Sequence, residues 1–200
     1  MQKEISNFGD RAEVTMQSNV AGSETVGIEG HYHVVCRDAD GNIKWEDEFP
    51  NLVNAGGKQL MLDTLLSGTS YTTVGPFLGL ISGTSLTFAA ADTLSSKTWT
   101  EFTNYTVGGS AVRGTASFSS ATSSGTTPTN VTTKTASAIT YTITGGGGTV
   151  GGCFLVTGSG ASSTQGNTSG TLYSAGAFGT AKVTTAGDTV SVTYSTTATS

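Results

Sequence analysis

The stretch FPNLVNAGGKQLMLDTLLSG, residues 49–68, carries the clearest helical pattern in the sequence. Asn54 can cap the first turn through its side chain, and Gly68 follows the last apolar residue, where a left-handed C-cap favours glycine. Gly56 and Gly57 each lower helix stability by up to about 1 kcal/mol relative to alanine, so this helix requires tertiary contacts. We expect one short α-helix over about 55–67. Its large apolar residues recur at helical spacing: Leu60, Met61, Leu62, Leu65 and Leu66.

A β-hairpin is predicted immediately before the helix. The segments 26–37 and 43–49 alternate apolar and polar residues, and the Asp, Gly and Asn residues of 38–42 favour a turn between them. Pro50 is expected to end the second strand.

Short apolar or alternating runs continue after the helix, separated by Gly, Ser and Thr. This pattern is typical of β-strands. Residues 82–102 are less regular and predict a long loop with one strand near Trp99, and the four glycines of 145–148 predict a turn. The expected strands are 76–82, 111–119, 137–144, 150–157, 170–178 and 188–196.

The fold class that follows is mainly β, with one short helix against the β-rich body or at its end. Two hundred residues suit a single domain. We expect a β-sandwich, jelly roll or barrel over 26–200, preceded by an extended N-terminal arm over 1–25. The arm is polar and weakly patterned, so we expect it to become ordered on a partner or on a neighbouring subunit.

Charge is sparse and unevenly distributed. The net charge is −5; residues 1–63 contain eleven acids and five bases, whereas 64–200 contain three acids and four bases. The sequence has no basic cluster, which argues against direct nucleic-acid binding. It also has no signal-peptide pattern and no apolar run of membrane-spanning length, so we expect no membrane partner and free thiols at Cys36 and Cys153 in a reducing cytoplasm.

His31 and His33 form the most conspicuous candidate metal site. Residues two apart on a strand share a face, so both imidazoles could bind one ion. A cupin-type site would need a carboxylate a few residues further on, where Arg37 and Asp38 stand, and a third histidine on a later strand, and the sequence has no third histidine. We therefore expect no metal and no cofactor.

Other catalytic or ion-binding patterns are incomplete. Residues 38–42 resemble the start of a calcium loop, but Ile43 and Phe49 stand where the motif requires glycine and glutamate. The serines lack a nucleophile elbow, and 145–148 lacks the lysine of a phosphate loop. We expect the protein not to be an enzyme.

A partner interface is the remaining candidate site. Glu46, Asp47 and Glu48 form an acidic run on the predicted second strand, where charge also protects a sheet edge from incorrect pairing. Trp99 and Tyr105 can serve as aromatic anchors, either in the core or at an interface. These five residues are the predicted interface set.

Parts of the sequence resemble a family of small virion proteins of tailed bacteriophages. The resemblance covers about 43–200 and is carried by IKWEDEFPNLVNAGGKQLMLDTLLSG, FLGLISG, LYSAGAF and DTVSVTYS. It implies a non-enzymatic structural protein, made in the host bacterial cytoplasm and located on the virion.

Among virion roles, we expect a capsid cement or decoration protein. Such a protein would bind the major capsid protein across subunit junctions and would associate with itself as a dimer or trimer. The first alternative is a tail-tube, head–tail connector or fibre-associated protein. A tube subunit would favour a long exposed hairpin, which 82–110 could supply, whereas the long repeats that a fibre would favour are not seen. Further alternatives are a glycan-binding module with exposed aromatics in 99–105, and a cupin-like metal enzyme using His31 and His33.

Overall fold

The computed structural model describes residues 27–66, 74–120, 122–124 and 131–199. The chain is mainly β with one short helix, which confirms the predicted fold class. The predicted N-terminal arm lies outside the described residues. The elements in chain order are β1 (Gly27–Arg37), β2 (Ile43–Val53), α1 (Ala55–Leu66), β3 (Val74–Ser82), β4 (Thr100–Phe102), β5 (Tyr105–Thr106), β6 (Gly114–Thr115), β7 (Thr122–Ser124), β8 (Val131–Thr135), β9 (Ile139–Ile143), β10 (Gly148–Gly158), β11 (Thr171–Thr184) and β12 (Thr189–Thr199).

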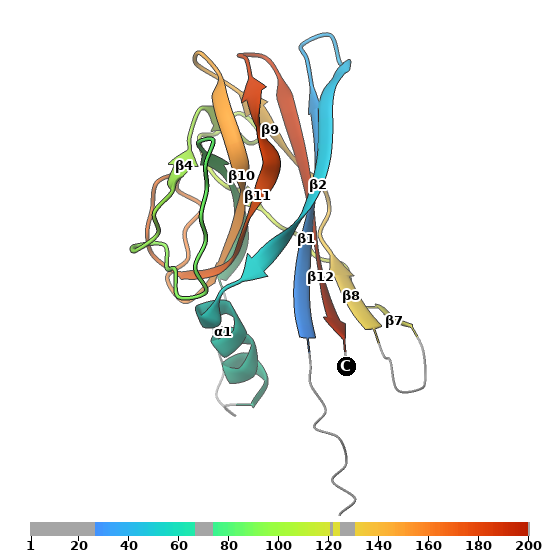
Figure 1. Cartoon of the computed structure of the whole chain (residues 1–200), viewed down its shortest axis with the longest axis vertical. Helices are drawn as coiled ribbons and strands as arrows, with labels where there is room; N and C mark the ends of the chain where they lie inside the picture. The colour runs from blue at the N-terminus through green and yellow to red at the C-terminus, as the bar shows by residue number, and fades with distance from the viewer. Residues whose placement is uncertain (1–26, 67–73, 121, 125–130, 200) are drawn as a thin grey trace, which may run out of the picture.

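The strands form one sheet that curls into a nearly closed barrel. Its main order is β4-β3-β10-β11-β2-β1-β12-β8-β7, with β9 paired to both β12 and β5, and β6 paired to β3. Figure 1 shows two halves facing each other: β4, β10 and β11 on one side, and β1, β2, β12 and β8 on the other. The hydroxyl of Tyr141 on β9 donates to the carbonyl of Leu78 on β3 at 2.8 Å, which links the halves at the open side.

The hairpin of β1 and β2 confirms the strongest local prediction. The two strands pair from Gly30 with Asn51 to Arg37 with Ile43. Asp38 Oδ1 accepts the backbone N–H groups of Asp40 and Asn42 at 3.0 and 2.8 Å. The carboxylate that suggested a calcium loop therefore fixes the turn.

Pro50 does not end β2, which continues to Val53, so this prediction is wrong. Alternate residues of an antiparallel strand point their N–H groups to opposite sides. Glu48, two residues before Pro50, donates its N–H to Asp47 Oδ1 at 2.9 Å. The missing N–H of Pro50 thus falls on the side of β2 that faces away from β1, where the ladder does not need it.

The opposite side of β2 faces β11 across a seam in the barrel. Backbone pairing there is limited to Leu52 with Ala175 and Val53 with Ser174. Towards the hairpin, side chains close the seam instead. Trp45 and Phe49 on β2 both pack edge-on against Phe178 on β11, with ring centroids 5.5 and 4.8 Å apart.

Two hydrophobic clusters stabilise the fold on opposite faces of β3, β10 and β11. The inner cluster fills the barrel and includes four tyrosines that are fully buried: Tyr32, Tyr105, Tyr141 and Tyr194. The outer cluster lies under the loop of residues 83–99, which we call the outer loop, and includes Leu94, Trp99 and Phe154. Because β10 is covered on both faces, its residues 150–156 form a continuous buried run of apolar residues and glycines.

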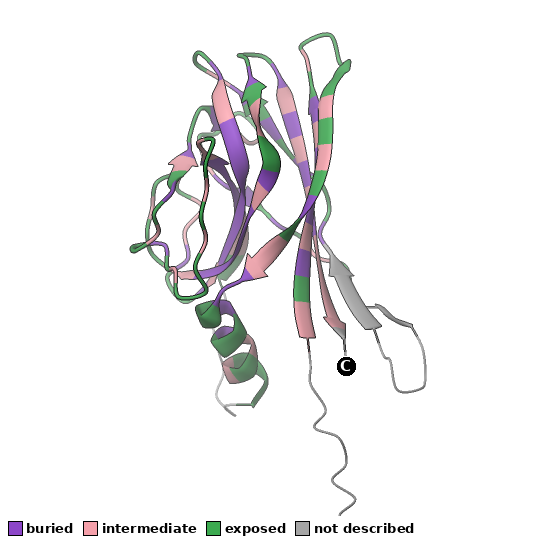
Figure 2. Ribbon diagram, viewed as in Figure 1, coloured by how far each residue is buried: buried purple, intermediate pink, exposed green. Residues whose placement is uncertain are grey.

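The helix lies at one end of the barrel, beside the start of β1 and the end of β12 (Figure 1). Its first half packs on β11, where an added Cβ at Gly57 would lie 2.6 Å from the backbone oxygen of Tyr173. This close approach explains a glycine that propensity alone disfavours. Leu60 is the buried leucine of α1, whereas the second half is largely exposed (Figure 2).

The side chain of Asn54 does not act as the predicted helix cap. Its Nδ2 donates instead to the carbonyls of Ala89 and Asp92 in the outer loop, at 3.0 and 3.4 Å, and its Oδ1 has no hydrogen-bond partner among the described residues. Asn54 is buried and holds the outer loop against the start of the helix.

The segment 82–120 differs most from the sequence prediction. One strand, β4, begins directly after Trp99 as expected, but 111–119 contains only the two-residue strand β6. The sequence prediction also missed β7 and β8, because it interpreted their Ser- and Thr-rich sequence as turns.

Candidate functional site

Trp99 and Tyr105 do not lie at the surface, so placing them in a partner interface is wrong. Trp99 is 5% exposed and Tyr105 is fully buried. The Trp99 ring packs 5.1 Å from Phe154 in the outer cluster, and the Tyr105 ring meets Tyr141 edge-on at 4.8 Å in the inner cluster. Both are core residues of the barrel wall and its covering loop.

The acidic run divides between two surfaces. Glu46 and Glu48 are exposed and share the outer face of β2, whereas Asp47 is half-buried and points the other way. Asp47 Oδ2 forms an ion pair with Lys182 Nζ on β11 at 2.8 Å. Asp47 therefore bridges the seam, and Glu46 and Glu48 remain available to a partner.

The outer face of β2, β1 and β12 brings the exposed acids beside the predicted histidine pair. His31 and His33 alternate with the buried residues Tyr32 and Val34, as predicted for two residues on one face of a strand. His33 Nε2 lies 2.8 Å from Glu46 Oε1. Because both side chains are about half exposed, this contact orients them and contributes little to stability.

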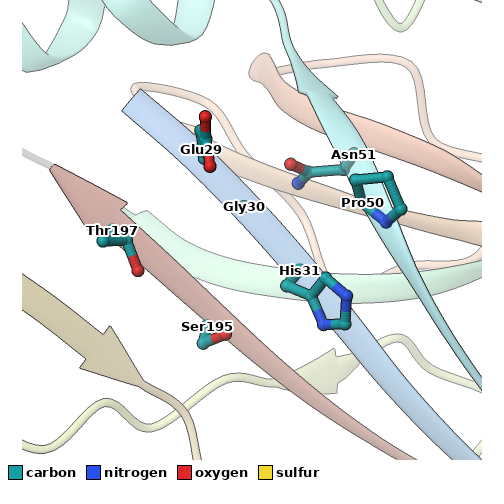
Figure 3. A pocket seen from close by; sticks show the side chains of 7 residues that line it. All are labelled: Glu29, Gly30, His31, Pro50, Asn51, Ser195 and Thr197. Atoms are coloured by element: carbon teal, nitrogen blue, oxygen red, sulfur yellow. The ribbon is translucent and has the colours of Figure 1, made fainter. Parts of the chain in front are cut away.

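A shallow hollow of about 370 Å³ lies at the end of this face (Figure 3). Glu29 and His31 from β1, Asn51 from β2, and Ser195 and Thr197 from β12 line it. These side chains could hydrogen-bond a polar ligand or a partner's side chains. Gly30 is the β1 residue between Glu29 and His31, and a Cβ there would overlap the side chain of Asn51 and the hydroxyl of Tyr194, so glycine leaves room for both groups.

Asn51 lies beneath this hollow. Its Nδ2 is 3.2 Å from the hydroxyl oxygen of Tyr194, and its Oδ1 is buried without a hydrogen-bond partner among the described residues. Asn51 therefore connects the hydroxyl of Tyr194 in the inner cluster to the lining of the hollow.

The described residues offer little to metal or thiol chemistry. Among them, no three His, Cys, Asp or Glu side chains lie together in an arrangement that could hold a metal ion. Cys36 and Cys153 are buried. Burial raises the pKa of the Cys36 thiol to about 11 and raises the pKa of the Cys153 thiol further, which disfavours the reactive thiolate at neutral pH.

A buried ion pair, which the sequence analysis missed, fixes the loops beside the outer cluster. Arg113 donates from Nε and Nη2 to the two carboxylate oxygens of Glu101, at 2.9 and 2.7 Å. Arg113 also donates to the carbonyls of Ser162 and Asn167, and Glu101 accepts the N–H of Gly166. Both side chains are at most 5% exposed. The signal in the sequence was one arginine and one glutamate in a region almost free of charge.

The second half of α1 presents an apolar surface. Leu62, Leu65 and Leu66 are 58%, 75% and 77% exposed. They stand at positions i, i+3 and i+4, so they form one stripe along the helix. The apolar periodicity that predicted the helix therefore marks a surface as well as a core contact.

Comparison with known protein families, with characterised proteins and with solved structures finds no match to this chain. No helix in the described part of the chain is long and apolar enough to cross a membrane.

Proposed function

We propose that the chain is a structural protein of a tailed-bacteriophage virion, serving as a capsid cement or decoration protein. The observation that carries the proposal is the polar outer face of β2, β1 and β12, on which Glu46 and Glu48 are exposed beside the two histidines. A rigid acidic face can bind a basic patch of a capsid shell with little loss of conformational entropy. The resemblance of 43–200 to small virion proteins supports the assignment to a virion.

The proposed partner is the major capsid protein, with contacts made across the junctions between its subunits. Each acidic face contributes modest binding. Several linked copies then bind with an avidity well above that of one copy, because each further contact is intramolecular.

Two of the alternatives lose the features that motivated them. A tail-tube role was based on a long exposed hairpin in 82–110, but the outer loop packs on the barrel through Leu94 and is held by Asn54. A glycan-binding role was based on exposed aromatics in 99–105, where Trp99 and Tyr105 are buried.

Locating the protein on the particle tests the proposal. The chain is tagged in a phage that encodes it, and copies per purified particle are counted and mapped by electron microscopy. Hundreds of copies over the shell support the cement role. A few copies at one vertex would place the protein in the tail, and absence from the particle would refute a virion role.

Charge reversal then tests the proposed face. We expect Glu46→Lys together with Glu48→Lys to reduce capture by shells that lack the protein. Asp40→Lys is the matched control, because Asp40 is an exposed acid at the hairpin turn, away from this face. Equal capture of both variants and the wild type would show that the acidic face does not bind the shell.

A further inference from the structure

A groove of about 660 Å³ separates the helix from the ends of β1 and β12. Met61, Leu62 and Leu65 form its helix wall, and Ile28 and Ala198 form its strand wall. Five apolar side chains facing one groove are unusual at a surface so rich in serine and threonine. We infer that this groove and the leucine stripe beside it form the interface with a second copy of the chain.

The choice of a second copy follows from the shape of α1. The helix forms one wall of the concave groove, and its exposed end carries Leu65 and Leu66 as a projecting apolar ridge. A two-fold axis allows the ridge of each copy to enter the groove of the other, which is the self-complementary arrangement that a symmetric dimer requires.

The area is consistent with a dimer. The three exposed leucines present roughly 400 Å² of apolar surface, the size of the largest apolar patch on a typical monomer. A standard interface uses about 800 Å² from each partner. The groove walls and the adjoining strand ends can supply the remainder.

The charges at the groove suit the same arrangement. Lys58 lines the helix wall and Glu29 the strand wall. In a two-fold dimer the helix of one copy faces the strand ends of the other, so each lysine meets a glutamate of the opposite copy. Such pairs at the rim favour the correct orientation more than they add affinity.

Disulfide crosslinking of the full-length protein tests this interface directly. The chain has two cysteines, and both are buried, so an introduced surface thiol reacts alone. We expect Leu65→Cys to form a covalent dimer under mild oxidation. Gln59→Cys is the matched control, because Gln59 is exposed on the same helix but does not line the groove, and it should stay uncrosslinked.

Sedimentation and light scattering provide the second readout. We expect wild type and Gln59→Glu to be dimers at micromolar concentration and Leu65→Glu to be a monomer with an unchanged circular-dichroism spectrum. Leu65 is three-quarters exposed, so the substitution leaves the fold intact. If the variant nevertheless fails to fold, the crosslinking result decides.

Several outcomes would overturn the inference. A wild-type monomer without crosslinking through residue 65 would exclude the dimer. A dimer that survives Leu65→Glu would place the interface elsewhere. A monomer in which the Leu65→Cys thiol resists maleimide labelling would show that another part of the same chain covers the groove. The inference does not rest on the capsid role, since a dimer in solution and a copy count on particles can fail independently.

Discussion

Removing the charge of Glu101 tests the energetic role of the buried ion pair. Glu101→Gln keeps the size and shape of the side chain but leaves Arg113, with a side chain only 1% exposed, without its counter-charge. The substitution also places an amide N–H₂ group where a carboxylate oxygen now accepts hydrogen bonds from Arg113 or Gly166. Breaking a buried pair from one side costs about 3–5 kcal/mol.

This loss is large relative to the 5–15 kcal/mol that holds a typical domain folded. With a urea m-value of about 2 kcal/mol/M, the unfolding midpoint should fall by roughly 2 M. Trp99 packs on the same Phe154 ring that Arg113 covers at 5.1 Å, so tryptophan fluorescence reports on this region during unfolding.

The matched control is Glu46→Gln, the same chemical change in a half-exposed pair with His33. A surface pair contributes about 0–1 kcal/mol, so the control midpoint should shift by less than about 0.5 M. Equal shifts for Glu101→Gln and Glu46→Gln would refute the argument that burial gives the Glu101 pair its importance.

Three other predictions concern the helix glycines, the buried carboxylate of Asp188 and the two thiols. Urea unfolding should show Gly57→Ala to be less stable by about 1–3 kcal/mol, because its methyl would meet the β11 backbone at 2.6 Å. Gly56→Ala, whose nearest neighbour is a side-chain methyl at 3.3 Å, should be neutral or up to about 1 kcal/mol more stable. Burial raises the pKa of Asp188, but its lysine partner and a backbone N–H lower it more, so the net shift is downward. The stabilisation by Asp188 is therefore present above about pH 4 and lost as pH falls through the lowered pKa. Unfolding curves should show Asp188→Asn about 1–2 kcal/mol less stable than wild type at pH 7, with the gap closing towards pH 3; a gap independent of pH would contradict this. Ellman's reagent should react with neither Cys36 nor Cys153 in the folded protein at pH 8 and with both after unfolding; fast reaction of the folded protein would disprove their burial.

Local signals predicted the parts of the fold that local interactions determine. The hairpin of β1 and β2 depends on a turn whose residues bond to one another, so the sequence contains its whole explanation. The apolar runs of β3 and β10 and the alternation of β12 were recognisable because their apolar side chains are buried in the core.

Features that depend on distant neighbours were not predictable. Whether Pro50 ends a strand depends on which side of β2 carries its missing N–H, and therefore on the position of β1. Trp99 packs on Phe154, 55 positions further along the chain, and Tyr105 packs on Tyr141, 36 positions further along. Asn54 stands at the sequence position of a helix cap, but its side chain donates to the carbonyl of Ala89, 35 residues away in the outer loop.

The candidate site was predicted in part. Alternation correctly placed His31 and His33 on one face, and Glu46 joined them because β1 and β2 are neighbours. The hollow beside them could not be foreseen, since it requires β12, which lies more than 140 residues further along the chain.

The seam between β2 and β11 has a consequence for how the barrel exchanges its amide hydrogens with solvent. Along 45–51, the N–H groups of β2 that point to β1 belong to a ladder, while those between them point to β11, with which they form no backbone pairs. The amide hydrogens of successive β2 residues should therefore exchange alternately fast and slowly. This alternation should end at Leu52, where backbone pairing to β11 begins.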